Sequence, residues 1–117
     1  MNKFYLTTAI PYVNAKPHVG HALEFVQADV IKRYRKSLGD EVLLLSGADE
    51  NAIKNVQAAE KEGKKVQEFI DIHSREFQEL ARALNIEFDV FRISNQKFSI
   101  AATLQVGIVL FDSFLFP

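Results

Sequence analysis

The passage from an apolar, strand-like run into a long amphipathic helix near the N-terminus places the strongest constraint on how this chain folds. Phe4 to Ala9 is rich in aromatic and β-branched residues and predicts a strand. The turn residues of Asn14 to Pro17 predict a loop, and His18 and His21 stand where the helix begins. Backbone N–H groups and the positive end of the helix dipole converge at such a helix start. The segment therefore predicts a place that can hold a phosphate group.

The rest of the chain continues the alternation of strands and helices. Val42 to Leu45 is a short, continuous apolar run of the kind that forms a buried parallel strand. The expected elements are a strand over 4–9, a helix over 20–37, a strand over 41–46, helices over 49–62 and 66–84, a short strand over 88–91 and a further helix from Asn95 to about Leu104. Strand, loop, helix and strand in this order form a βαβ unit, which is right-handed by default. The order of elements predicts an α/β fold, namely a partial doubly wound, Rossmann-like nucleotide-binding domain with parallel strands.

Composition narrows the functional classes. With 117 residues the chain suits one domain or a piece of a larger one, and its net charge of −1 gives no overall electrostatic footprint for nucleic acid. The chain has no cysteine, so we expect no disulfide and no cysteine-ligated zinc site. The N-terminus lacks the features of a secretory signal, and Gln105 and Asp112 interrupt the apolar stretch from Ile100 to Phe116. A cytoplasmic protein without a membrane helix is therefore expected.

A series of short sequence blocks carries more information than the histidine pair alone. They are Thr8-Ala9-Ile10-Pro11-Tyr12 with Asn14, His18-Val19-Gly20-His21, Gln27-Ala28-Asp29-Val30, Arg33-Tyr34, Gly39-Asp40-Glu41-Val42, Ser46-Gly47-Ala48-Asp49-Glu50-Asn51 and Gln57-Ala58-Ala59. With these blocks the chain resembles the class I aminoacyl-tRNA synthetases, and the methionyl-tRNA synthetases in particular. The HxGH pattern occurs in other nucleotidyltransferases as well, but the extended block is more specific. The resemblance covers roughly four fifths of the chain, to about Gln96.

This resemblance implies a methionine–tRNA ligase. Such an enzyme uses ATP, with Mg²⁺, to activate methionine as methionyl-adenylate with release of pyrophosphate, and then transfers the methionyl group to tRNA(Met). We expect residues 1–98 to be the N-terminal part of its catalytic domain. The tail over residues 99–117 is apolar and unlike the expected continuation, which suggests a truncated or frame-changed end. The chain also lacks the family's lysine-rich KMSKS loop, so we expect this fragment to be inactive alone and to need a complementing chain.

The two histidines are the predicted catalytic residues. In the resembled family this motif binds the ATP phosphates and stabilises the α-phosphate while charge builds on its oxygens, which is the task that fixed hydrogen-bond donors perform. The resemblance assigns His18, Gly20, His21 and Glu24 to ATP binding, and a glycine keeps the backbone open for a nucleotide. The alternative is that the histidines only cap the helix, and that Glu24 only complements the helix dipole.

Methionine binding is predicted at the ends of the two strands. Asp49 follows the second strand, where ligands of doubly wound sheets bind, and its carboxylate suits an ammonium group. The resemblance assigns the methionine amine to Asp49, and methionine contacts to Ile10 and Tyr12. The alternative for Asp49 is a helix N-cap. The sequence departs from the family at Asn51 and Ala52, where a histidine and a glycine are common.

Two other function classes remain open at this point. A different HxGH nucleotidyltransferase would carry a second basic motif near the C-terminus, and this sequence has none. A non-enzymatic fragment that binds an amino acid or a nucleotide would show ligand-induced stabilisation without turnover. His73 stands among Asp71, Arg75 and Glu76, which predicts a surface histidine.

Overall fold

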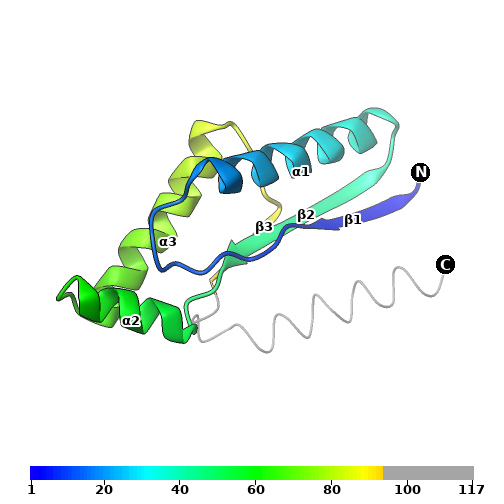
Figure 1. Ribbon diagram of the computed structural model, residues 1–117. Helices are drawn as coiled ribbons and strands as arrows, with labels where there is room; N and C mark the ends of the chain where they lie inside the picture. Colours follow the sequence, from blue (N-terminus) through cyan, green and yellow to red (C-terminus); the bar gives the residue numbers. More distant parts are fainter. Residues whose placement is uncertain (94–117) are drawn as a thin grey trace.

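The computed structural model describes residues 1–93, and these form a three-stranded parallel sheet with helices packed against it (Figure 1). The elements are β1 (Lys3–Thr7), α1 (Val19–Ser37), β2 (Glu41–Ala48), α2 (Ile53–Lys61), α3 (Val66–Ala83) and β3 (Val90–Ile93). The strand order is β1-β2-β3, and both strand pairs are parallel. The predicted α/β fold with parallel strands is thus confirmed.

The strand register aligns β1 with the first part of β2, and the chain that follows β1 continues beside the end of β2. Lys3 pairs with Glu41 and Thr7 with Leu45. Beyond β1, the backbone N–H of Asp49 donates to the carbonyl oxygen of Pro11 at 2.8 Å, and Tyr12 and Asp49 form an isolated parallel bridge. The backbone therefore stays extended through Asp49, and α2 begins at Ile53, four residues later than the sequence predicts.

The end of helix α1 carries two features that are typical of a helix C-terminus. Arg35 and Lys36 lie in its last turn, where positive charge complements the helix dipole. Gly39, just after the C-cap residue Leu38, adopts a φ of +87°, which favours glycine. The residues from Asn95 onward, including the expected helix to Leu104 and the tail over 99–117, lie outside the described residues.

The hydrophobic core lies between the sheet and the helices α1 and α3. Its buried members are Val13, Phe25, Ala48, Ile70, Phe77, Ala81 and Ile86. Phe25 comes from α1 and Phe77 from α3, so the two helices meet over the carboxyl end of β2. Val13 belongs to the loop after β1, and its complete burial anchors that loop to the core.

A buried lysine joins α1 to the sheet. The side chain of Lys32 is only 5% exposed, and its Nζ atom lies 2.9 Å from Oδ2 of Asp89 and donates to the carbonyl oxygen of Glu87 at 2.6 Å. The same Asp89 oxygen accepts the backbone N–H of Leu44 at 2.7 Å. One carboxylate thus connects α1, β2 and the segment that leads into β3.

Candidate functional site

His18 and His21 cap α1 reciprocally. His18 is the N-cap residue, and its Nδ1 atom accepts the backbone N–H of Gly20 at 3.0 Å. Nδ1 of His21 accepts the backbone N–H of His18 at 3.1 Å, and the two rings stack with their centroids 3.9 Å apart. An imidazole nitrogen that accepts a hydrogen bond carries no proton, so each neutral ring carries its proton on Nε2. The caps therefore make both Nε2 atoms hydrogen-bond donors.

Gly20 fits tightly against this cap. A Cβ atom at this position would lie 2.9 Å from Cε1 and 3.0 Å from Nδ1 of His18, closer than such atoms approach. A larger residue would therefore displace the His18 ring. The resemblance assigns Gly20 to ATP binding, where a glycine lets a nucleotide approach the backbone. The close contact with the His18 ring is a second, local reason for a glycine at this position.

The ring of His21 also touches the core. It meets Phe77 edge-on with the centroids 4.9 Å apart. Burial lowers the pKa of His21 below its ordinary value of 6.5, the neighbouring His18 lowers it further, and Glu24 opposes this shift. At neutral pH His21 is accordingly an uncharged donor that is held in place by the protein core.

This lowered pKa predicts a pH dependence of stability. As pH falls below 6.5, the unfolded chain takes up a proton at His21 before the folded chain does, so the free energy of unfolding should fall. Urea unfolding at pH 7.5 and pH 6.0 should show the loss, and His21→Asn, which keeps an acceptor for the cap, should reduce it. An equal pH dependence in both proteins would contradict this reason.

Glu24 connects α1 to the loop after β1. Its Oε1 atom accepts the backbone N–H of Ala9 at 2.7 Å. Glu24 is not in the first turn of α1, so the alternative of a dipole-complementing first-turn acid does not describe it. The carboxylate instead holds the segment that carries Ile10 and Tyr12 next to the helix that carries the two histidines.

Glu24→Ala should destabilise the fold by about 1 kcal/mol, because a hydrogen bond to a charged acceptor is lost at an accessible site. Glu24→Gln, which keeps the carbonyl acceptor, should lose less. Urea unfolding measures both changes, and hydrogen exchange at the Ala9 amide reports the bond itself. Unchanged exchange in Glu24→Ala would show that the bond does not hold this loop.

The predicted methionine-binding residues lie together at the carboxyl ends of β1 and β2. Tyr12 is bridged to Asp49 through the backbone, and Ile10 and Tyr12 are each 46% exposed. Asp49 is not the N-cap of α2, since that position belongs to Ala52, which makes no side-chain cap bond. Oδ1 of Asp49 instead accepts the backbone N–H of Asn51 at 3.1 Å. The N-cap alternative for Asp49 is therefore wrong.

Asn55 supports Asp49, and sequence patterns did not single it out. It is fully buried in α2, and its Nδ2 atom donates to the carbonyl oxygen of Asp49 at 2.9 Å. A buried amide with such a bond fixes the main chain on which the Asp49 carboxylate is carried. The sequence did offer one signal for Asn55. It lies four residues before Ala59 and so on the same buried face of α2, where a polar residue is unusual.

The interpretation of His73 as a surface histidine is wrong. His73 is only 6% exposed, its Nδ1 atom lies 2.6 Å from Oε2 of Glu76, and its ring meets Phe69 edge-on. The helical spacing shows why, because His73 lies four residues from both Phe69 and Phe77 and so shares their buried face. Of the neighbouring charges that suggested exposure, Asp71 and Arg75 are exposed, whereas Glu76 is half-buried and contacts His73.

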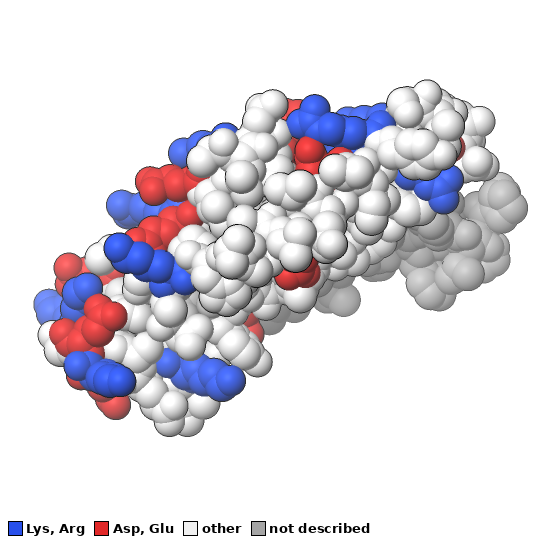
Figure 2. Space-filling view, turned by 45° about the horizontal axis from the view of Figure 1, so that its top comes forward, with Lys and Arg blue, Asp and Glu red and all other residues white. Residues whose placement is uncertain are grey.

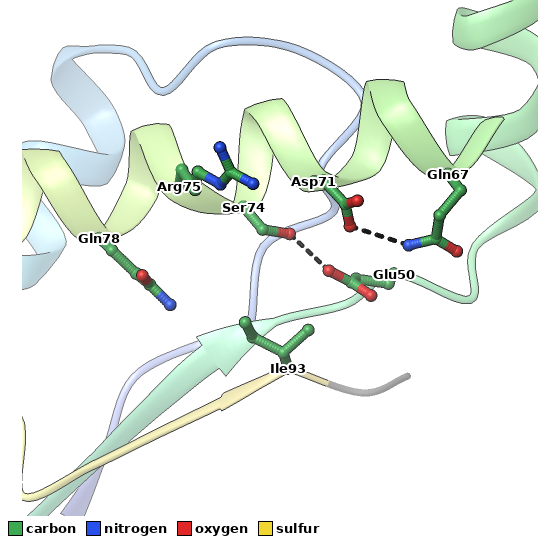
Figure 3. Close-up of a pocket in the computed structure, with 7 residues that line it drawn as sticks. All are labelled: Glu50, Gln67, Asp71, Ser74, Arg75, Gln78 and Ile93. Carbon is green, nitrogen blue, oxygen red and sulfur yellow. Dashed lines mark hydrogen bonds between the residues drawn. The ribbon is translucent and has the colours of Figure 1, made fainter. Parts of the chain in front are cut away.

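A polar pocket of about 490 Å³ lies beside this site, between α3 and the ends of β2 and β3 (Figure 3). Its lining residues are Glu50, Gln67, Asp71, Ser74, Arg75, Gln78 and Ile93. Oε1 of Glu50 accepts the Ser74 hydroxyl at 2.7 Å. Burial raises the pKa of the Glu50 carboxyl, the Ser74 hydrogen bond opposes that shift, and the charge of Asp71 adds to it. Sequence patterns did not predict this pair, because Glu50 and Ser74 are far apart in the chain.

Residues 1–93 lack two kinds of feature. No group of three or more His, Asp or Glu side chains is placed to hold a metal ion. No helix in this part of the chain is long and apolar enough to span a membrane.

Comparison with known proteins agrees with the geometry. A model of the family described as tRNA synthetases class I (M) matches residues 4–110. The methionine–tRNA ligases of Rhizobium meliloti and Thermotoga maritima are 48% and 45% identical to this chain over 75% and 76% of its length. A solved structure of Mycobacterium tuberculosis methionyl-tRNA synthetase, in complex with methionyl-adenylate, superposes with a TM-score of 0.80 and 40% identity over 83% of this chain.

The matched segment is a small part of each of these proteins. The chain spans 17% of the Rhizobium ligase, 14% of the Thermotoga ligase and 19% of the Mycobacterium structure. The family match nevertheless covers most of the chain and includes both histidines and Asp49. The chain therefore belongs to the methionine-type class I tRNA synthetases.

Proposed function

We propose that this chain forms the ATP-facing and methionine-facing part of a methionine–tRNA ligase active site. In the complete enzyme the methionine carboxylate attacks the α-phosphate of ATP, pyrophosphate leaves, and the methionyl group of the adenylate then passes to tRNA(Met). The reciprocal cap of His18 and His21 is the observation that carries the proposal. It presents two fixed donors at a helix N-terminus, where a phosphate is favoured.

The histidines would act as donors to the ATP phosphates. During attack on the α-phosphate, negative charge moves onto its oxygens and onto the departing pyrophosphate. Donors that are already in position stabilise that charge without reorganisation in the transition state. His18 is held by its bond to Gly20, and His21 by its bond to His18 and by Phe77. Glu24 contributes by holding the loop after β1, and a contact to the nucleotide ribose is part of the proposal.

The methionine would lie at the ends of β1 and β2. The Asp49 carboxylate would accept a charge-assisted hydrogen bond from the methionine ammonium group. Tyr12 and Ile10 offer exposed aromatic and aliphatic surface beside it, which suits a flexible thioether. The solved relative that carries methionyl-adenylate shares this fold.

Ligand binding by the chain itself tests this assignment. Isothermal titration calorimetry with ATP, and with a non-hydrolysable methionyl-adenylate analogue, separates the two halves of the site. The double variant His18→Ala/His21→Ala should weaken both ligands by about tenfold to a hundredfold, because hydrogen bonds to charged groups are lost. Asp49→Asn should weaken the methionyl-adenylate analogue and leave ATP unchanged.

A matched control and a competing ligand make the result decisive. Glu41→Gln removes an exposed carboxylate at the far end of β2 and should change neither affinity. A leucyl-adenylate analogue should bind more weakly than the methionyl one. Equal affinity for both would favour another HxGH nucleotidyltransferase over a methionine–tRNA ligase.

The chain alone is expected to give no ATP–pyrophosphate exchange, since the remaining parts of the active site lie in the portions of the relatives that it does not span. An exchange rate comparable to that of a complete synthetase would contradict this.

Because tRNA is charged where proteins are made, the proposed function also fits a cytoplasmic location, although one similar protein is described as mitochondrial.

A further inference from the structure

Asn55 is a fully buried amide that uses only part of its hydrogen-bonding capacity. Charged side chains of both signs crowd the end of the molecule where α2 and α3 meet (Figure 2), but Asn55 is not part of this surface. Its Nδ2 atom donates to the carbonyl oxygen of Asp49 at 2.9 Å. Within residues 1–93, its Oδ1 atom is the one buried side-chain oxygen or nitrogen that has no hydrogen-bond partner. A buried polar atom without a partner lowers stability, so its presence in a folded protein calls for a reason.

The orientation of the Asn55 amide follows from its contact with Asp49. A carbonyl oxygen only accepts hydrogen bonds, so the amide nitrogen must face it and the amide oxygen must face elsewhere. Asn55 is the third residue of α2, where a side-chain oxygen can accept the backbone N–H of the N-cap residue in a capping box. Because Oδ1 has no partner, that local bond is not made. The bond to Asp49 therefore replaces an interaction that would have stabilised the helix start.

The whole first turn of α2 departs from the pattern that favours a helix start. Its N-cap residue is Ala52, which makes no side-chain cap bond, and the turn has no acidic residue. Lys54 instead places a positive charge at the positive end of the helix dipole. The Nζ atom of Lys54 lies 5.4 Å from the centroid of the Tyr12 ring. Lys54 and Asn55 thus each contact a predicted methionine-binding residue, and local rules are broken mainly at functional or strained sites.

The main chain of Asp49 is held from two sides. Its backbone N–H donates to the carbonyl oxygen of Pro11 at 2.8 Å, and its own carbonyl oxygen accepts the Asn55 amide. A binding group is effective when supporting hydrogen bonds fix it in the productive direction. We propose that Asn55 is a positioning residue for methionine binding, whose amide holds the Asp49 main chain and so directs the Asp49 carboxylate toward the methionine ammonium group. This inference rests on the proposed role of Asp49.

Two substitutions of Asn55 in the full 117-residue chain separate a hydrogen bond from the filling of space. Asn55→Leu keeps a similar side-chain volume but cannot donate, whereas Asn55→Ala loses both the donor and the volume. Isothermal titration calorimetry should show that both variants bind the methionyl-adenylate analogue about tenfold more weakly, with ATP affinity within about twofold of the wild type. If Asn55→Leu keeps its affinity and only Asn55→Ala loses it, Asn55 merely fills space and the proposal is wrong.

Stability should not follow affinity in these variants. Asn55→Leu removes the oxygen that lacks a partner together with the bond to Asp49, so its melting temperature should stay within about 5 °C of the wild type. Gln57→Leu is the matched control, because it replaces an amide with the same aliphatic side chain at an exposed position of α2, and it should change neither affinity. A large drop in melting temperature with unchanged affinity would make Asn55 a purely structural residue. If circular dichroism shows that Asn55→Leu does not fold, Asn55→Ala carries the remaining measurements.

A double-mutant cycle shows whether Asn55 acts through Asp49. The variant Asp49→Asn/Asn55→Leu should bind the methionyl-adenylate analogue no more weakly than Asp49→Asn does, because the side chain that Asn55 positions has already lost its charge. Additive losses in the double variant would place the effect of Asn55 elsewhere and would overturn the proposal.

Hydrogen exchange distinguishes this proposal from the proposed function, because it needs no ligand. Loss of the Asn55 bond should speed exchange at the backbone amides of Asp49 and Asn51, which donate to Pro11 and to the Asp49 carboxylate. If Asp49→Asn weakens the methionyl-adenylate analogue but exchange is unchanged in the Asn55 variants, the positioning role alone is wrong. If Asp49→Asn leaves that affinity unchanged, the proposed function fails at Asp49, and the link between Asn55 and methionine fails with it.

Discussion

Replacing Phe77 with alanine should lower the free energy of unfolding by about 3–5 kcal/mol, the largest effect on stability that we expect in this chain. Phe77 is completely buried and belongs to the core cluster shared by α1, α3 and the loop after β1. Its removal costs the transfer free energy of an aromatic ring and leaves a cavity. For a domain whose total stability is about 5–15 kcal/mol, such a loss would unfold a large fraction of the molecules.

The same substitution should also weaken ATP binding at the proposed site, because the Phe77 ring contacts the His21 ring from the core side. Urea unfolding measures the stability loss, and the ATP affinity of the residual folded chain, measured at low temperature, reports the site. Ile53→Ala removes an aliphatic side chain at a position that is 72% exposed, and it should change stability by less than about 0.5 kcal/mol. Similar losses in the two variants would show that Phe77 is not a core residue.

Lys32→Ala should destabilise the fold by about 2–3 kcal/mol, because a partly exposed carboxylate and a carbonyl group lose the hydrogen bonds of a buried, charged partner. The ammonium group of Lys32 satisfies both Asp89 and the Glu87 carbonyl. Lys32→Met fills the same space with an apolar chain and isolates the loss of charge from the loss of volume. Its cost should be smaller than that of Lys32→Ala, and urea unfolding at neutral pH should rank the two variants in that order.

The pKa of Asp89 provides an independent check on this ion pair. Burial works to raise the pKa of this carboxyl, but hydrogen bonds from the Leu44 amide and Lys32, together with the lysine charge, lower it below its ordinary value of 3.8. The bonded carboxylate therefore stabilises the fold above that value, and this stabilisation is lost as pH falls through the folded pKa. In Lys32→Met the Asp89 pKa, followed by NMR, should rise. An unchanged pKa would show that the lysine does not stabilise the carboxylate.

Much of the local structure could be predicted from the sequence. The strand-loop-helix passage around His18, the buried strand that includes Val42 to Leu45 and the long helix over most of residues 66–84 are all present. These features depend on side chains within one or two turns of each other, or on an alternation of apolar residues. The family also follows from short blocks of neighbouring residues, and the family match confirms it.

The errors lie where a distant element decides the outcome. The predicted second long helix begins late, because a backbone bond from Asp49 to Pro11 keeps the chain extended. His73 is buried on the face of α3 that it shares with Phe69, and its charged neighbours in the sequence gave no sign of this. The bond from the Ala9 amide to Glu24 was not predicted either, because it depends on how the loop after β1 returns to the helix; the assignment of Glu24 to ATP stays a prediction.

Whether the sequence or the tertiary structure determines a feature depends on how far apart in the chain the interacting residues are. By itself, the sequence determined the order of strands and helices, the capped helix start with its two histidines, and the family. Only the tertiary structure decided which polar groups are buried and with whom, as for Glu50 with Ser74, 24 residues apart, and Lys32 with Glu87, 55 residues apart. Caps and periodicity act through bonds between near neighbours in the chain, whereas desolvation and ion pairing depend on how the elements pack together in three dimensions.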